Sequence, residues 1–419
     1  MRNIFDQYNQ PENRLTHSLA TALNQDKSLL KNFLSRFGPN DIPDVKTLQV
    51  IEQGLPGSVI VDDENEAERR GLPDMVIFNE KGWALLIESK VSSSLTKDQL
   101  QRHSRTIQKC GIDKIYGLAI TVAPSPFSLT GWQMTTWKDV YSWANEHTPQ
   151  SAWAKHMVEY FNIAENKMAQ NEYLVEGTIT EFSGINFDPY TYLEGKRVLR
   201  LLTNKIRNNK SFVREMDLDQ NSKRPAITND PWGVWDFVSF NANASSDKNF
   251  TSHPHCTFGF SDKDRHASGM ITCPNAMERP LLKNLIGPSH DDFSLRLKDA
   301  LSSITKNLHA VKGYKPVIRM VQRHYKSQRS SAVIDGEMTV DLRACFGGED
   351  HHMGRPIKPQ EQWLRAVYEL LSNKRSNIQF QIGVVFPYDL CPEIKSRNAD
   401  ELFINSFRAL KPFIKSIMA

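Results

Sequence analysis

The chain has 419 residues and a net charge of +4, so we expect two domains rather than one, and the charge alone indicates no nucleic-acid partner. It contains no run of eighteen apolar residues and no apolar N-terminal core, so we expect neither a membrane span nor secretion. The five cysteines are scattered and form no CxxC pair, which is typical of reduced thiols in a cytoplasmic protein.

The first 170 residues alternate between helical and strand patterns. After Pro11, three leucines (Leu15, Leu19 and Leu23) recur every four residues, which predicts an N-terminal helix with one buried stripe. The next elements are expected in the order helix, strand, hairpin, helix, strand and two helices, over 29–37, 58–61, 74–91, 96–110, 114–122, 138–147 and 151–170. This order predicts an α/β fold in which helices flank a sheet.

The clearest pattern is a hairpin that carries three charged side chains. Its strands are expected over 74–78 and 83–91, with a turn over 79–82. Glu88 and Lys90 are two residues apart on one strand, so their side chains leave the same face of the sheet. Asp74 lies on the other strand, and a turn over 79–82 would leave it out of simple register with Glu88. We therefore expect a twist or splay to bring these two carboxylates together.

Two carboxylates and a lysine on adjacent strands form a minimal set for hydrolysing a phosphodiester. A divalent cation neutralises the phosphate and lowers the pKa of the attacking water, and carboxylates are the ligands that Mg²⁺ accepts. A lysine beside them can stabilise the developing negative charge. The segment 84–87 is entirely apolar, so the second strand is expected to be buried on both faces. Charges at the end of such a strand are costly unless they are paired or bind a metal.

The same residues resemble a known signature. Pro73-Asp74, then thirteen residues, then Glu88-Ser89-Lys90 is similar to the motif of the PD-(D/E)XK nuclease superfamily. The resemblance covers roughly residues 10–125 and implies a restriction-endonuclease-like mixed sheet flanked by helices. It implies that Asp74 and Glu88 hold Mg²⁺ (or Mn²⁺), that the backbone carbonyl of Ser89 adds a ligand, and that Lys90 assists the water.

Two further site residues are implied by the resemblance. Members often carry a glutamate on the first helix, for which Glu12 is the candidate, as a catalytic residue and metal ligand. Many also place a glutamine on the helix after the lysine, where Gln99 lies four residues before His103 and Gln101 is a rival. Each feature also has a structural interpretation. The acids and lysine could form a surface salt-bridge cluster, Glu12 could simply favour a helix N-terminus, and Gln99 and His103 could face solvent.

A boundary is expected near residues 171–176, which gives a nuclease-like domain over 1–170 and a second domain over 176–419. The second domain mixes strands and helices, so we expect an α+β domain that binds DNA, senses a ligand or mediates assembly. Its strands are expected over 235–240, 256–260, 269–273, 316–321, 332–334, 338–342 and 378–386. Its helices are expected over 193–205, 291–308, 360–373 and 399–417.

The basic excess of the chain lies in this second domain. Of the 52 Lys/Arg and 48 Asp/Glu residues, only 18 and 20 lie in residues 1–170. Two stretches, 196–210 and 312–329, contain six Lys or Arg residues each and no acid. Such patches hold phosphate backbones, although each could also be one solvated face. The residues expected to bind nucleic acid are Lys196, Arg197, Arg200, Arg319, Arg323, Lys326 and Arg329.

These observations predict a cytoplasmic, Mg²⁺-dependent endonuclease that cuts DNA. By analogy of fold alone, it resembles restriction or anti-phage defence effectors that act as homodimers or with partner subunits. Two alternatives stay open. One is a non-catalytic DNA-binding or assembly module on a degenerate nuclease fold, and the other is a nuclease that cleaves RNA.

Overall fold

The chain divides into two compact units, Met1–Glu181 and Phe182–Ala419. This division lies beyond the stretch 171–176 in which we expected the boundary. The carboxylate of Glu165 accepts the backbone N–H groups of Ile179 and Thr180 at 2.6 and 2.9 Å, which ties these two residues to the first unit. The computed structural model describes residues 5, 11–56, 72–91, 93–170, 177–187, 189–222, 232–241, 251–326, 332–350, 355–373 and 377–419. Within these ranges, no helix is long and apolar enough to cross a membrane.

The first unit is built on a five-stranded mixed sheet in the order β1-β2-β3-β4-β5. The first three strands pair antiparallel, and β3, β4 and β5 pair parallel. The strands are β1 (Gln49–Glu52), β2 (Met75–Asn79), β3 (Trp83–Lys90), β4 (Lys114–Thr121) and β5 (Trp132–Thr136). Seven of the eight residues of β3 are buried, as its apolar sequence predicts for a central strand.

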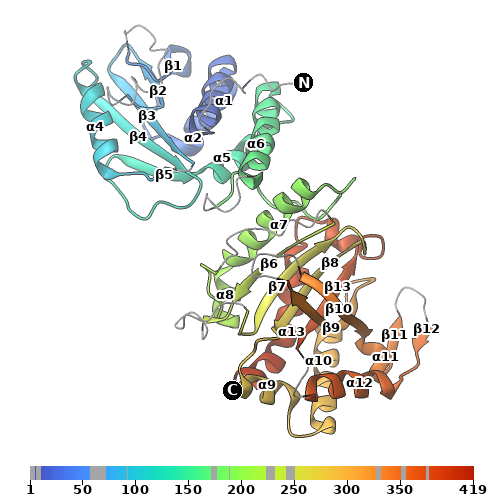
Figure 1. Ribbon diagram of the computed structural model, residues 1–419. Coiled ribbons are helices and arrows are strands. Elements are labelled where there is room, and N and C mark those ends of the chain that lie inside the picture. The colour runs from blue at the N-terminus through green and yellow to red at the C-terminus, as the bar shows by residue number, and fades with distance from the viewer. Residues whose placement is uncertain are drawn as a thin grey trace. The chain divides into compact units, whose positions relative to one another are not determined.

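Helices cover both faces of this sheet. Leu85 and Ile87 of β3 belong to one core cluster, which they share with helices on one face, whereas Ala84 and Leu86 point to the other face. The helices on the first face are α1 (Pro11–Gln25), α2 (Lys27–Phe37), α5 (Trp137–His147) and α6 (Ala152–Gln170). The opposite face is covered by α4 (Lys97–Gln108), and Figure 1 shows α4 and α1 on opposite sides of the strands. The first unit therefore has the α/β architecture, with a mixed sheet flanked by helices, that the sequence predicts.

The second unit contains a six-stranded antiparallel sheet in the order β10-β9-β13-β8-β7-β6. Its strands are β6 (Gly233–Ser239), β7 (His255–Ser261), β8 (His266–Cys273), β9 (Lys315–Tyr325), β10 (Ala332–Asp341) and β13 (Ile378–Pro387). A separate hairpin pairs β11 (Gly348–Asp350) with β12 (Arg355–Ile357). The two short strands expected over 332–334 and 338–342 are one strand, β10, because a register shift between Ile334 and Gly336 absorbs the irregularity.

Helices of the second unit pack on one face of this sheet through aromatic side chains. Phe258 of β7 contacts Phe403 and Phe407, and Phe380 of β13 contacts Phe293. These contacts place α13 and α10 on the same face, because Phe258 and Phe380 point the same way in the registered sheet. The helices are α7 (Tyr192–Arg207), α8 (Lys210–Met216), α9 (Arg279–Ile286), α10 (His290–Asn307), α11 (Leu342–Phe346), α12 (Glu361–Ser372) and α13 (Asp400–Met418). Short 3₁₀ turns lie at Val45–Thr47 and Pro392–Lys395.

Candidate active site

The β2–β3 hairpin brings the two acidic residues of the motif face to face. Met75 pairs with Ile87 and Asn79 pairs with Trp83, so Asp74, one residue before Met75, lies opposite Glu88. The expectation that these acids are out of simple register is therefore wrong. The turn is shorter than predicted because Asn79 already belongs to β2, and its side chain accepts the N–H groups of Lys81 and Trp83.

Asp74 is tied to the strand that carries the other two motif residues. Its Oδ2 accepts the backbone N–H of Ser89 at 2.7 Å, and Ser89 lies between Glu88 and Lys90 in sequence. A hydrogen bond from a backbone amide to a carboxylate is charge-assisted and fixes the direction of the side chain. Asp74 remains half-buried, whereas Ser89 is fully buried. The hairpin therefore holds an aspartate at the edge of the site and a glutamate inside it.

Glu88 is the centre of the site. Only 1% of the residue is exposed, and both carboxylate oxygens have polar neighbours. Lys90 Nζ lies 2.7 Å from Oε1, and Gln99 Nε2 donates to the same oxygen at 2.6 Å. His103 Nε2 lies 3.0 Å from Oε2, at ion-pair distance but without the alignment of a regular hydrogen bond. Burial raises the pKa of Glu88, but the attraction of His103 and Lys90 outweighs it, so the pKa lies below its ordinary value and the carboxylate is ionised.

Helix α4 supplies the two neighbours of Glu88 that lie outside the hairpin. Thr96 caps this helix by accepting the N–H of Gln99, and Leu100 and Ile107 are fully buried against the sheet. Gln99 and His103 are four residues apart, so they lie on the same side of the helix. Gln101, the rival candidate, is exposed. The sequence places Gln99 and His103 four residues apart on this helix, although only Gln99 was expected in the site, and the structure brings both side chains to Glu88.

The donor atoms of this cluster suit a hard divalent cation. Asp74 and Glu88 offer carboxylate oxygens on facing strands, and Mg²⁺ is typically bound by one or two carboxylates with several waters. The residues described include no group of three or more His, Cys, Asp or Glu residues that could hold a metal ion.

The side chain of one acidic candidate, Glu12, lies outside the described part of the chain. The backbone of Glu12 belongs to α1, but its side chain is not among the described atoms. The strand expected over 58–61 lies entirely outside the described residues. The helix that carries Glu12 packs through Leu15 and Leu19 on the sheet face opposite α4. The part of Glu12 in the site stays a prediction.

The basic residues of the second unit fall into two environments. On α7, Lys196 and Arg200 are 6% and 8% exposed, and Arg197 pairs with Glu194. Burial of this kind removes Lys196 and Arg200 from an exposed phosphate-binding surface, contrary to the sequence-based expectation for this helix. On β9, Arg319 and Arg323 are half-buried, Lys326 just beyond the strand is exposed, and Arg329 lies outside the described residues.

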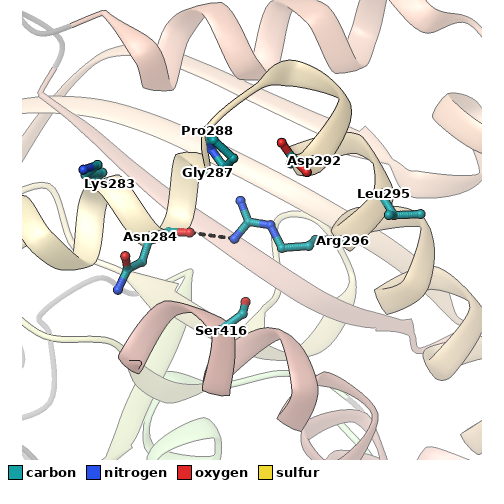
Figure 2. A pocket seen from close by; sticks show the side chains of 8 residues that line it. All are labelled: Lys283, Asn284, Gly287, Pro288, Asp292, Leu295, Arg296 and Ser416. Atoms are coloured by element: carbon teal, nitrogen blue, oxygen red, sulfur yellow. Dashed lines mark hydrogen bonds between the residues drawn. The ribbon is translucent and has the colours of Figure 1, made fainter.

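The second unit also contains a hollow on its surface. It has a volume of about 380 Å³ and is lined by Lys283, Asn284, Gly287, Pro288, Asp292, Leu295, Arg296 and Ser416. Figure 2 shows the guanidinium of Arg296 directed at the end of α9, where it donates to the carbonyls of Asn284 and Leu285 at 2.6 and 2.8 Å. An arginine on the last carbonyls of a helix is a capping interaction. The guanidinium of Arg296 therefore has a structural role in this hollow, as the cap of α9.

Comparison with known families agrees with the geometry of the first unit. A family model of the PD-(D/E)XK nuclease superfamily matches residues 2–183, which include the β2–β3 hairpin and α4. No curated protein and no solved structure matches the chain. The matched range corresponds closely to the first compact unit, and the acid–acid–lysine cluster lies inside it. Residues 2–183 of this chain therefore form a domain of the PD-(D/E)XK nuclease superfamily, whose members are generally nucleases.

Proposed function

We propose that this protein is a metal-dependent endonuclease that hydrolyses DNA phosphodiester bonds. The observation that supports the proposal best is the cluster at the end of the β2–β3 hairpin. There Asp74 is bound to the backbone between Glu88 and Lys90, and Glu88 is ionised in a buried position. A domain with a purely structural role would gain nothing by keeping an acid and a lysine at the buried end of an apolar strand.

Each residue of the cluster has a role in the proposed reaction. Asp74 and Glu88 would hold Mg²⁺ or Mn²⁺, together with the carbonyl of Ser89, and Glu12 is the candidate for a further ligand. When bound, the cation would neutralise the scissile phosphate and lower the pKa of the attacking water. The ammonium group of Lys90 would orient that water and stabilise negative charge that develops on the phosphate. Gln99 keeps Oε1 of Glu88 in place through its 2.6 Å hydrogen bond.

The second unit is proposed to hold the nucleic acid through β9. Lys315, Arg319 and Arg323 recur every four residues on this strand, so all three leave the same face of the sheet. That face is opposite the one on which α10 and α13 pack, because Ile318 and Phe380 point to the helices. The buried Nε of Arg323 has no hydrogen-bond partner among the described residues. A row of cations spaced along a strand suits the regular negative charge of a phosphate backbone.

Two finer assignments belong to the same proposal. DNA is favoured over RNA by the resemblance to restriction and repair endonucleases, and no described contact distinguishes the two sugars. A restriction or anti-phage defence role, as a homodimer or with partner subunits, rests on the pairing of a nuclease domain with a second unit and is an analogy of fold. The rival function, a binding module without catalysis, predicts that the wild type cuts no substrate and that no Mg²⁺ or Mn²⁺ binds near Glu88.

The decisive experiment is cleavage by the full chain with and without Mg²⁺. Linear duplex DNA, supercoiled DNA, single-stranded DNA and RNA are incubated with the wild type and with Glu88→Gln, and the products are separated on gels. We expect the wild type to cut a DNA substrate only when Mg²⁺ or Mn²⁺ is present, and Glu88→Gln to cut none while keeping its circular dichroism spectrum. Equal cleavage by both proteins would remove the assignment, and cleavage of RNA alone would replace DNA as the substrate.

A further inference from the structure

His103 of α4 makes a contact with Glu88 that neither Lys90 nor Gln99 duplicates. Lys90 and Gln99 both approach Oε1 of the glutamate, whereas His103 Nε2 lies 3.0 Å from Oε2. Both partners are inaccessible to solvent, with 2% of His103 and 1% of Glu88 exposed. Water therefore has little access with which to compensate Oε2, and His103 is the neighbour positioned to do so.

The chemistry of the two groups decides the direction of this contact. A carboxylate oxygen can only accept, so an Nε2 of His103 that lies 3.0 Å from Oε2 carries its hydrogen, although the two groups lack the alignment of a regular hydrogen bond. The last torsion of a glutamate side chain is broad, because it joins an sp³ carbon to an sp² carboxylate. Donors on Oε1 alone would leave the plane of the carboxylate free to turn about that oxygen. The N–H group of His103 beside Oε2 restricts that turn.

His103 is itself held firmly, so it can transmit this constraint. On the helix, His103 lies between Leu100 and Ile107, which are fully buried. Both of these residues belong to the core cluster beneath α4. The helix is also bound to β5, because Trp132 Nε1 donates to Ser104 Oγ at 3.3 Å. Support of this kind, from a rigid element behind a binding group, is what keeps a site in productive geometry.

The simpler interpretation is that His103 is only a core histidine whose polarity has been satisfied. Two other histidines of the chain show how a histidine is satisfied by a nearby backbone carbonyl. His147 Nδ1 contacts the carbonyl of Trp143 one turn earlier on its own helix, and His255 Nδ1 contacts the carbonyl of His253. Both serve the local backbone. The Nε2 of His103 instead reaches across to the ionised side chain at the centre of the site.

We propose that His103 is a positioning residue, which holds Oε2 of Glu88 so that the carboxylate is presented to the divalent cation in one orientation. The inference rests on the proposed function, because it assigns Glu88 to the metal. It adds a residue from α4 that determines how strongly the cation binds. Outer partners of metal-binding side chains commonly change metal affinity by about 10- to 100-fold when they are removed.

The test compares two substitutions of His103 in the full chain. His103→Leu removes the donor and keeps an apolar side chain between Leu100 and Ile107, whereas His103→Gln keeps an N–H that can reach a carboxylate. Binding of Mn²⁺ is measured by calorimetry without nucleic acid, and cleavage is measured as a function of Mn²⁺ concentration. We expect His103→Leu to weaken Mn²⁺ binding about tenfold or more, and His103→Gln to restore most of the loss.

A positioning role predicts that His103→Leu lowers the affinity for Mn²⁺ but not the cleavage rate at saturating Mn²⁺, whereas a disrupted fold would lower both. At saturating Mn²⁺ the cleavage rate of His103→Leu should return to within a few-fold of the wild type, because Asp74, Glu88 and Lys90 are unchanged. His147→Leu is the matched control, since it also removes a helical histidine of the first unit, and it should bind Mn²⁺ like the wild type. If His103→Leu does not fold, His103→Gln decides alone, and a tenfold loss in that folded variant overturns the donor role.

The outcomes also separate this inference from the proposed function. Wild-type protein that binds Mn²⁺, together with a folded His103→Leu that binds it equally well, overturns the role of His103 and leaves the nuclease proposal standing. Wild-type protein that binds no divalent cation overturns both. Weaker binding by His147→Leu to the same extent would show that the effect is not specific to the contact with Glu88, and would also overturn the inference.

Discussion

The two sheets of this protein differ in where their strands carry charged residues. In the first unit, helices cover both faces of β3, and its charged residues are confined to the end of an otherwise apolar strand. In the second unit, β9 carries the cations Lys315, Arg319 and Arg323 along its length, with the buried Val317 and Val321 between them on the same face. Cations of β9 therefore share a face with apolar residues along the whole strand, whereas the apolar run of β3 carries no charge before Glu88. The charged residues at the end of β3 therefore need a separate explanation, and the proposed role of these residues in hydrolysis provides it.

The difference also appears in two ion pairs, one from each sheet. Glu88 and Lys90 have side chains that are 1% and 15% exposed, whereas Arg319 and Glu337 are 33% and 37% exposed at a similar distance. Exposed pairs contribute little to stability because water screens them, but removing one partner of a buried pair leaves a costly charge. The buried cluster should therefore control both rate and stability, and the exposed one should control neither.

The largest expected effect concerns Lys90. Lys90→Met keeps the length of the side chain but removes the ammonium group that would stabilise charge on the phosphate. We expect the single-turnover cleavage rate at saturating DNA and Mg²⁺ to fall about 100- to 1000-fold, with little change in DNA affinity. Lys81→Met, in the exposed turn of the same hairpin, is the control and should cut like the wild type. A Lys90→Met protein that cleaves at the wild-type rate would contradict the proposal that the hairpin carries the catalytic residues.

Stability provides the second and smaller contrast. Glu88→Gln removes the anion between Lys90 and His103, so we expect the free energy of unfolding at neutral pH to fall by about 2–3 kcal/mol. That is less than a fully buried pair would lose, because Lys90 retains some access to water. Glu337→Gln should cost about 1 kcal/mol or less. Urea denaturation, followed with a probe in each unit, measures both values, and equal losses would contradict the distinction between the two pairs.

The pH dependence of that loss follows from the pKa of Glu88. This pKa lies below its ordinary value of 4.5 in the folded protein, so the ionised form stabilises the fold. The stabilisation is fully present above about pH 4.5 and is lost as the pH falls through the lower pKa of the folded state. The stability difference between the wild type and Glu88→Gln should therefore shrink as the pH falls below 4.5. A difference that grows on acidification would mean that Glu88 is not held as an anion.

Much of the first unit could be predicted because its signals are local. The apolar run before Glu88 and the Glu-x-Lys spacing specify a central strand with a charged end, and these do not depend on distant residues. Other features depend on tertiary contacts. The strand β5 is short and follows a Pro- and Ser-containing stretch, so its pairing with β4 has little signal in its own sequence. The register of Asp74 was predicted wrongly because the end of the turn depends on how Asn79 binds the backbone.

The two basic stretches show most clearly what could not be predicted from the sequence. Lys196–Lys210 and Lys312–Arg329 look alike as sequences, since each has six cations and no acid. In the fold, Arg207 pairs with the buried Asp236, and Lys205 pairs with Asp400, so the first stretch attaches α7 to the rest of its unit. The acids that neutralise these cations lie outside the stretch, and the same holds for the second stretch, where Arg319 pairs with Glu337. Composition alone cannot tell such a stretch from one that faces a ligand.

The smallest effect is expected for the cations on β9 of the second sheet. Arg323→Ala removes one cation from the row on β9, so we expect DNA affinity near physiological salt to fall about fivefold and the salt dependence of binding to weaken by about one charge. The cleavage rate at saturating DNA should not change, because Arg323 belongs to the second sheet and not to the cluster around Glu88. Arg365→Ala is the matched control, since Arg365 is an exposed cation of the same unit on α12 rather than on the sheet. Fluorescence anisotropy at several salt concentrations measures both variants. Equal losses would mean that the second unit attracts DNA through its overall charge, and that the row on β9 has no special place in binding.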